Sequence, residues 1–370
     1  GRVFPDEGFM SLSFRKGGYG STEKIRRGRF DLRAAASMLA HMKNVLQTLM
    51  MVLLGSPLTV AGSGGGEFVV IAHRGASGYL PEHTAVATAM AHAMGADFIE
   101  QDVALTKDGK ALVIHDVTLE STTDVARIFP DRRRKDGRFY VIDFTSSEIR
   151  QLRKGERINR MTGKTVYPER YPSGHYDFPL MFLGEAIGLI RGMDASRDRE
   201  TGFYTELKKP EFHAAEGMDP VPPFMEALRK AGALEGPVPC HIQCFHPPTL
   251  KRIRAEYGKE LSLVQLIGNN SWGESSADYN AMLTPEGIAA VAEYAKGIGL
   301  PIEAIVDASG PVLRWRPVKD WATAHGLMIH PYTLRRETVP DGHTYEALLA
   351  FLAGADGVDG VFTDFPDIQP

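Results

Sequence analysis

The stretch FVVIAHRGASGYLPEHTAVATAMAHAMGADFIEQDV, residues 68–103, joins two short apolar runs through a longer helical pattern. The apolar runs, 68–72 and 98–103, have the length and composition of buried β-strands, and the pattern of 84–94 is that of a helix. Strands that alternate with helices in this way are typical of an α/β fold with a parallel sheet. The stretch therefore predicts the first strand, the first helix and the second strand of such a sheet.

The same alternation continues along the rest of the chain. Eight runs are interpreted as buried strands: 68–72, 98–103, 203–207, 240–244, 261–267, 302–306, 328–332 and 358–363. Helical patterns lie between most of them, for example 285–296, 318–324 and 345–352. Eight strands with intervening helices indicate a closed parallel barrel rather than an open sheet. We therefore predict a TIM-type (β/α)8 barrel that spans residues 67–370.

The connection after the second predicted strand is too short to contain a helix. Residues 107–110 read Lys-Asp-Gly-Lys, and Asp-Gly is typical of a two-residue hairpin turn. Counting outward from this turn pairs Asp102 with His115. We therefore expect an extra hairpin strand on the second barrel strand, with His115 beside the carboxylates of Glu100 and Asp102.

The alternating pattern weakens from about residue 116 to 202. We interpret this stretch as a small insertion that caps the ends of the strands. It contains the basic run DRRRKD at 131–136. Two interpretations of this run stay open: a solvated loop, or a group of charges that attracts an anionic substrate.

Composition and charge fit one large globular domain. The chain has 370 residues, of which 43% are hydrophobic and 24% are charged. After residue 43 the chain carries 33 Lys and Arg against 42 Asp and Glu, so no basic surface for nucleic acid is expected. The two cysteines, Cys240 and Cys244, lie on one predicted strand roughly 13 Å apart, too far for a disulfide. We expect two buried thiols.

Segment 42–63, MKNVLQTLMMVLLGSPLTVAGS, has the layout of a secretory signal peptide. A basic residue precedes a short apolar run, 45–54, and small residues end at a cleavage site after Ala61. The run is too short for a transmembrane helix, which needs about 20 apolar residues. We therefore expect export to a bacterial periplasm without a stable membrane anchor; a buried helix is the alternative. Residues 1–41 are interpreted as an upstream extension outside the fold.

Polar side chains lie at the carboxyl ends of the first three predicted barrel strands, where barrels of this type place active sites. They are His73 with Arg74, Glu100 with Asp102, and Glu206 with Lys208. Three converging carboxylates without a thiolate suit a hard, oxygen-seeking cation, Ca²⁺ or alternatively Mg²⁺. For any single acid the alternative is a surface salt bridge. Converging acids would repel one another without a cation, which favours the metal site.

The order of motifs resembles the glycerophosphodiester phosphodiesterase family, especially its periplasmic bacterial branch. The resemblance runs from about Phe68 to Asp367 through HRGASGYLPEHT, IEQDVALTKDGKALVIHD, TELKKP, LVQL, HPYTLR and GVFTDFPD. It implies a barrel enzyme that hydrolyses a small-molecule substrate, a glycerophosphodiester, to sn-glycerol 3-phosphate and an alcohol. The sequence gives no indication of an oligomeric state.

The resemblance also assigns roles to individual residues. His73 and His115 match the general acid/base pair, and Glu100, Asp102 and Glu206 match the metal ligands, usually of calcium. The residues that match substrate contacts, or that fall at strand ends lining the pocket, are Arg74, Lys208, Glu82, Gln243, Gln265 and Tyr332. His83 stands where the family's Glu-Asn-Thr element has asparagine.

The implied reaction is an attack on phosphorus in which the cation, Arg74 and Lys208 offset negative charge and two histidines move protons. The attacking oxygen is either water or the glycerol 2-hydroxyl. Two other functions compete with this one. The barrel could serve as a secreted surface or binding protein with incidental activity, or it could act on a lysophospholipid in the manner of a phospholipase D.

Overall fold

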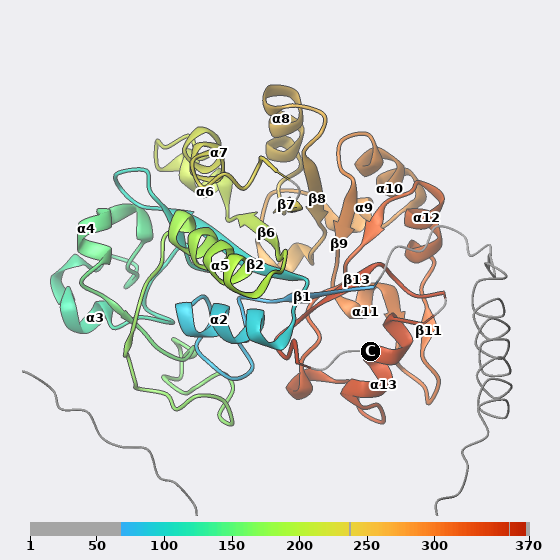
Figure 1. Cartoon of the computed structure of the whole chain (residues 1–370), viewed down its shortest axis with the longest axis horizontal. Helices are drawn as coiled ribbons and strands as arrows, with labels where there is room; N and C mark the ends of the chain where they lie inside the picture. The colour runs from blue at the N-terminus through green and yellow to red at the C-terminus, as the bar shows by residue number, and fades with distance from the viewer. Residues whose placement is uncertain (1–67, 237, 355, 368–370) are drawn as a thin grey trace, which may run out of the picture. The chain divides into compact units, whose positions relative to one another are not determined.

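The computed structural model describes residues 68–236, 238–354 and 356–367 (Figure 1). The predicted extension at 1–41 and the predicted signal peptide at 42–63 lie outside the described residues. Among the described helices, none combines the length and the apolar character needed to cross a membrane.

Eight parallel strands form the centre of the domain. They are β1 (Val69–Ala72), β2 (Phe98–Leu105), β6 (Gly202–Leu207), β7 (Cys240–Cys244), β8 (Ser262–Leu266), β9 (Gly297–Gly299), β12 (Met328–Ile329) and β13 (Gly360–Thr363). Their order is β12-β9-β8-β7-β6-β2-β1-β13. The Phe362 N–H donates to the Pro331 carbonyl at 3.0 Å, which joins the two ends of this order. The predicted TIM-type barrel is confirmed.

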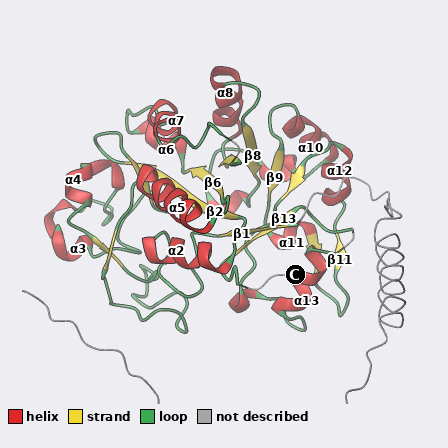
Figure 2. Cartoon of the chain, in the orientation of Figure 1, coloured by secondary structure: helices red, strands yellow, loops and turns green. Residues whose placement is uncertain are grey.

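Helices surround the strands on the outside of the barrel (Figure 2). They are α2 (Ala85–Met94), α5 (Leu183–Arg197), α6 (Pro210–Ala215), α7 (Val221–Lys230), α8 (Pro247–Tyr257), α9 (Tyr279–Met282), α10 (Pro285–Ala292), α11 (Ile302–Ile305), α12 (Val318–Ala324) and α13 (Tyr345–Leu352). Helix α2 begins after Thr84, whose hydroxyl accepts the Ala87 N–H at 3.2 Å. It ends at Gly95, which adopts φ of +93°. These caps satisfy backbone groups that a helix leaves unpaired.

Two apolar layers hold the barrel together. Side chains such as Tyr204 and Phe362 fill its interior. The larger core lies between the strands and the helices and includes Ile99 and Leu263. Cys240 and Cys244 are free thiols, as predicted, although Cys240 is only partly buried.

The sixth barrel strand differs from the prediction. The predicted strand 302–306 is mainly the short helix α11, and β9 supplies the strand instead. Because Gly-Ile-Gly has only one large side chain, β9 has no apolar run to reveal it. A Cβ atom at Gly299 would lie 2.6 Å from Leu266 Cδ2, so the Leu266 side chain would have to shift to admit it.

The predicted hairpin after β2 exists, but its register is shifted by one residue. Strand β3 (Ala111–Val113) pairs antiparallel with β2, and Val103 lies opposite Val113. The turn contains three residues rather than two, with Gly109 at φ of +69°. The predicted pairing of Asp102 with His115 is therefore wrong. His115 follows β3 beyond its end and reaches the strand ends through the connecting loop.

The insertion after β3 is shorter than the predicted 116–202. It contains α3 (Val125–Ile128), η1 (Pro130–Arg132), η2 (Val141–Asp143), α4 (Ser146–Ile149), β4 (Arg153–Lys154) and β5 (Phe178–Pro179). Helix α5, which lay inside the predicted range, is a barrel helix that packs against α2. The apolar core of the insertion includes Phe139 and Phe144, both fully buried, and is shared with Ala104 of β2 and Leu112 of β3. In Figure 1 the insertion is the segment coloured cyan to green.

Two of the four basic residues in the run at 131–136 form ion pairs. Arg132 contacts Glu148 at 2.5 Å, and Arg134 contacts Asp143 at 2.7 Å. Arg134 also contacts Glu216, just after α6, at 2.8 Å. These arginines therefore fasten the insertion to itself and to the barrel.

Candidate active site

A cavity of about 780 Å³ lies at the carboxyl ends of the barrel strands. The predicted residues that line it are His73, Arg74, Glu100, Asp102, His115, Glu206, Lys208, Gln243 and Tyr332. Two other predicted residues, Glu82 and Gln265, do not line it. The fold thus gathers side chains from β2, β6 and β7, from the residues just after β1 and from the loop after β3 around one space.

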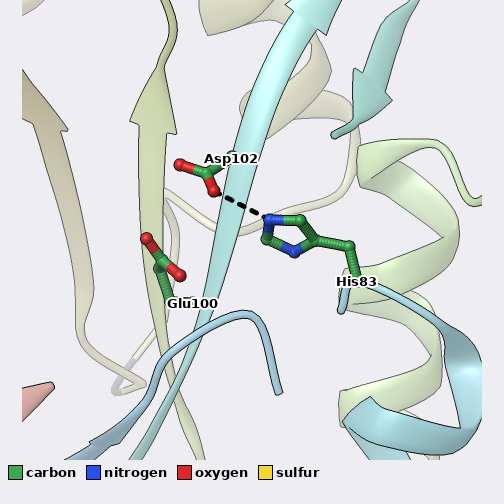
Figure 3. A group of neighbouring side chains, drawn as sticks. All are labelled: His83, Glu100 and Asp102. Carbon is green, nitrogen blue, oxygen red and sulfur yellow. Dashed lines mark hydrogen bonds and ion pairs between the residues drawn. The ribbon is translucent and has the colours of Figure 1, made fainter. Parts of the chain in front are cut away.

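Three buried side chains form a tight group in this region. His83, Glu100 and Asp102 each offer one ligand atom within 4.8 Å of the others. Figure 3 shows the His83 ring directed at the Asp102 carboxylate, with Glu100 beside them. His83 Nε2 lies 2.8 Å from Asp102 Oδ2. The group is able to hold a metal ion.

Glu206, the third predicted ligand, stands next to this group rather than in it. It lies on β6 at the position paired with Asp102 of β2, and it lines the same cavity. Its Oε1 atom lies 2.7 Å from Lys208 Nζ. The sequence indicated His83 only as a replacement for asparagine, so its contact with Asp102 was missed.

Burial and mutual repulsion shape the charges of these acids. Burial raises the pKa of Glu100 well above its usual value, and the neighbouring Asp102 and Glu206 add to the rise. Burial also works to raise the pKa of Asp102, but Lys208, followed by His115 and His83, holds it well below the usual value. The cluster therefore contains one carboxylate that is readily ionised and one that resists ionisation.

The donor set fits a hard divalent cation. Asp102 Oδ1 and Gln243 Oε1 are buried and have no hydrogen-bond partner among the described residues. Carboxylate and amide oxygens are typical ligands of Ca²⁺ and Mg²⁺. A cation there would satisfy these oxygens and would relieve the repulsion that raises the pKa of Glu100.

His73 forms a buried pair with an aspartate that sequence reasoning missed. His73 Nδ1 lies 2.6 Å from Asp364 Oδ1. Because a carboxylate only accepts, Nδ1 carries the proton and Nε2 is left as the basic nitrogen. Burial, with Arg74 second, lowers the pKa of His73 to about 3 despite the opposing effect of Asp364. Asp364 stands in the motif GVFTDFPD, immediately after β13, so its place at a strand end was available as a signal.

His115 forms a second pair of the same kind. Its Nδ1 lies 2.6 Å from Asp116 Oδ1, and Asp116 Oδ2 accepts from Arg157 Nη1 at 2.8 Å. Burial, then Arg74 and Lys208, lower the pKa of His115. Two neutral histidines, each oriented by an aspartate, thus face the same cavity.

Arg74 is anchored from two directions. Its backbone N–H donates to Glu100 at 2.7 Å, and its Nη1 donates to Glu82 at 3.0 Å. Glu82 in turn accepts from Arg157 through Nε at 2.8 Å and Nη2 at 2.7 Å. Glu82 was predicted as a substrate contact, and in the structure it orients Arg74. Arg157 of the insertion contacts both Glu82 and Asp116, and it was not predicted.

Lys208 is a fully buried cation between acids. Its Nζ lies 2.7 Å from Glu206, 3.7 Å from Glu274 and 4.0 Å from Asp102. Although burial opposes its charge, these carboxylates raise the pKa of Lys208, so it stays protonated. Glu274 lies in a loop after β8 that carried no recognisable motif, and it was missed.

The remaining predicted contacts differ in outcome. Gln243 donates to Glu100 Oε1 at 3.2 Å, and Tyr332 donates to the Ile267 carbonyl at 2.9 Å, so both are held at the cavity wall. Gln265 is not brought to the cavity. Its amide nitrogen contacts three backbone carbonyls and its oxygen accepts from Tyr294 at 2.8 Å, so its polar groups are used inside the fold.

A second, smaller cavity of about 200 Å³ adjoins this site. It shares His73, Arg74, His115 and Arg335 with the larger cavity. Its other lining residues come mostly from the insertion.

Comparison with known proteins agrees with this geometry. Residues 73–368 match the model of the glycerophosphoryl diester phosphodiesterase family. A glycerophosphodiester phosphodiesterase of Haemophilus influenzae is 38% identical over 323 residues, which cover 81% of this chain and 88% of that protein. Another, of Treponema pallidum, is 34% identical over 324 residues, which cover 82% and 90%.

Solved structures share the fold. The crystal structure of a protein from Silicibacter pomeroyi, described as a glycerophosphoryl diester phosphodiesterase, matches this chain with a TM-score of 0.60 and 24% identity. The match covers 83% of this chain and 94% of that chain. A phosphodiesterase of Oleispira antarctica, solved in complex with the product sn-glycerol-3-phosphate, has a TM-score of 0.54 and 22% identity, with coverage of 81% and 94%.

Proposed function

We propose that this chain, which belongs to the glycerophosphoryl diester phosphodiesterase family, hydrolyses glycerophosphodiesters to sn-glycerol 3-phosphate and an alcohol. The observation that carries the proposal is the meeting of two histidine–aspartate pairs and an oxygen-rich acidic group around one cavity. Proton transfer and charge stabilisation are the two requirements of phosphodiester cleavage.

The phosphate group is held by fixed cations. A phosphodiester is anionic, and negative charge builds on its oxygens as the attacking oxygen approaches. Arg74 and Lys208 line the cavity, and the pKa values of both are raised by neighbouring carboxylates, so both stay charged. They bind the phosphate and offset this charge.

Calcium is the cation that the site takes. Glu100, Asp102 and Glu206 supply the carboxylates, and His83 orients Asp102 through its 2.8 Å contact. When bound, the ion supplies positive charge that polarises the phosphoryl group. The three carboxylates favour Ca²⁺, whose irregular coordination tolerates acids from separate strands, and Mg²⁺ is the alternative.

His73 and His115 move the protons. One histidine, neutral and with Nε2 unprotonated, takes the proton from the attacking oxygen as its bond to phosphorus forms. The other enters the step as the imidazolium, protonated at both nitrogens, and its Nε2 gives a proton to the alcohol oxygen as the bond of that oxygen to phosphorus breaks. The support for this pair is that each ring donates through Nδ1 to an aspartate, which leaves Nε2 basic. The attacking oxygen is water or the glycerol 2-hydroxyl.

Release of glycerol 3-phosphate tests the function. The protein with calcium should release it from glycerophosphocholine, glycerophosphoethanolamine or glycerophosphoglycerol, and His73→Ala should lower kcat by about 10²–10⁴-fold. His325→Ala, at an exposed position, is the matched control and should keep full turnover. No release from any of the three diesters by the unaltered protein would exclude the proposal.

The site of action is proposed to be a bacterial periplasm. The support is the signal-peptide layout of segment 42–63, which the sequence alone provides. Expression of the full chain in a bacterium should yield a periplasmic form that begins after Ala61. N-terminal sequencing of the fractionated protein checks this, and an uncleaved cytoplasmic form would contradict it.

A further inference from the structure

The smaller cavity, of about 200 Å³, meets the larger one at the proposed reaction centre. Four residues line both: His73, Arg74, His115 and Arg335. A phosphodiester has two arms that leave phosphorus in different directions. A phosphate bound by the shared residues therefore extends one arm into each cavity.

The three carboxylates of the proposed metal site distinguish the two cavities. Glu100, Asp102 and Glu206 line the larger cavity and not the smaller one. In an in-line displacement the attacking and departing oxygens lie on opposite sides of phosphorus. With the glycerol arm and the attacking oxygen on the carboxylate side, the departing alcohol occupies the smaller cavity.

The arginines that line the smaller cavity are already paired. Arg157 contacts Glu82 at 2.7 Å, and Arg335 contacts Asp364 at 2.7 Å. Arg170 also contacts Asp364, at 2.8 Å. Their charges are therefore balanced by the protein itself, and they offer little attraction to a second anion.

Glu156 is different from the other acids of this cavity. It is only 4% exposed, its Oε2 has no hydrogen-bond partner, and it makes no ion pair among the described residues. Burial, with the nearby charge of Glu82, raises the pKa of Glu156 to about 7. The charges of Arg170 and Arg157 offset this rise only in part, and neither arginine forms an ion pair with Glu156. A bound cation would offset the remaining cost of burying the carboxylate.

We propose that the smaller cavity binds the departing alcohol and that Glu156 selects alcohols that carry an ammonium group, such as ethanolamine and choline. The inference rests on the proposed phosphodiesterase function. Val166 and Tyr167 line the same cavity and contact the carbon atoms of the alcohol. Glu156 is a specificity residue, because the proton transfers are assigned to other side chains.

Substrates that differ only in the alcohol test this inference. Glycerophosphoethanolamine carries an ammonium group and glycerophosphoglycerol carries none, while both share the glycerol phosphate. The unaltered enzyme should show kcat/KM at least tenfold higher for the ethanolamine diester. Glu156→Gln keeps the shape of the side chain and removes its charge, so it should raise KM for that diester about tenfold. It should change kcat/KM for glycerophosphoglycerol less than twofold.

Glu169 is an exposed glutamate of the same insertion, so Glu169→Gln is the matched control. It should leave kcat/KM unchanged for both substrates. An equal loss of kcat/KM for both substrates in Glu156→Gln would show that Glu156 has a structural role and would overturn the inference. Equal kcat/KM of the unaltered enzyme for the two diesters would overturn it without any variant. Failure of the unaltered enzyme on every diester would instead reject the phosphodiesterase function itself.

Discussion

His73 Nδ1 and Asp364 Oδ1 lie 2.6 Å apart, although 291 positions separate the two residues in the sequence. The pair joins the carboxyl end of β1 to the residue after β13, which are neighbours in the barrel. Asp364 is held in turn by Arg170 and Arg335, so the histidine is oriented by a fixed acid.

Asp364→Asn should impair the orientation of His73. An amide can present its NH₂ group to Nδ1, which moves the proton to Nε2 and removes the basic nitrogen. We expect kcat to fall on the order of 10²–10⁴-fold. Nitrogen-15 NMR of the labelled imidazole should report the change of tautomer. Asp367→Asn, whose acid accepts only from Tyr79 among the described residues, should leave both readouts unchanged.

The variant Glu100→Gln should separate the effect of charge repulsion among the buried acids from the effect of metal binding. Burial, Asp102 and Glu206 raise the pKa of Glu100, so removal of its charge should leave the melting temperature of the metal-free protein unchanged or higher. Added calcium should raise the melting temperature of the unaltered protein, because a ligand that binds the folded state stabilises it. The variant should lose that rise and most of the activity. Glu260→Gln, at an exposed position, should keep both, and a full calcium response in Glu100→Gln would contradict the site.

Lys208→Met should damage both stability and turnover. The variant leaves Glu206 and Glu274 without their buried cation, which costs about 3–5 kcal/mol when a buried pair loses one partner. Loss of the charge near the phosphate should lower kcat/KM about 10²–10³-fold. Lys209→Met, the neighbouring lysine that donates to a loop carbonyl, should change stability by less than about 0.5 kcal/mol. Urea denaturation and steady-state kinetics measure the two effects.

Protonation of His330 should weaken the fold in mild acid. Burial, with His241 second, lowers the pKa of His330 from 6.5 to about 3. Between pH 6.5 and 3 the unfolded chain therefore binds a proton on His330 that the folded chain does not bind. The contribution of this group to stability is full above pH 6.5 and is lost progressively between pH 6.5 and 3. At pH 5 the loss from this group is about 2 kcal/mol. Denaturation at pH 5 and 7.5 measures how far the free energy of unfolding falls between the two pH values. This fall should be smaller in His330→Gln than in the unaltered protein, and unchanged in His325→Gln.

The barrel and much of its site followed from side chains at strand ends. Glu100 and Asp102 occupy alternate positions of a strand that is otherwise apolar except for Gln101, and parallel strands end at one edge. Their convergence was therefore predictable. Glu274 was missed because it lies in a loop without a recognisable motif and far in sequence from its partner Lys208. Asp364 stood at a strand end, but nothing local linked it to its distant partner His73.

Other differences have local causes. Strand β9 was missed because its two glycines, which lie against Met328 and Leu266, carry no apolar signal. The hairpin register was missed because a left-handed Gly109 fits two-residue and three-residue turns alike. Gln265 was predicted at the cavity from its strand position, but nearby carbonyls bind its amide.

Arg157 gives the insertion a role beyond covering the barrel. One guanidinium contacts Glu82, which holds Arg74, and Asp116, which holds His115. The orientation of Arg74, which binds the phosphate, and of His115, which transfers a proton, thus depends on a single side chain from outside the barrel. A shortened relative without this segment would need another cation at the same point, and grafting the bare barrel into a new enzyme would leave two catalytic groups without their support.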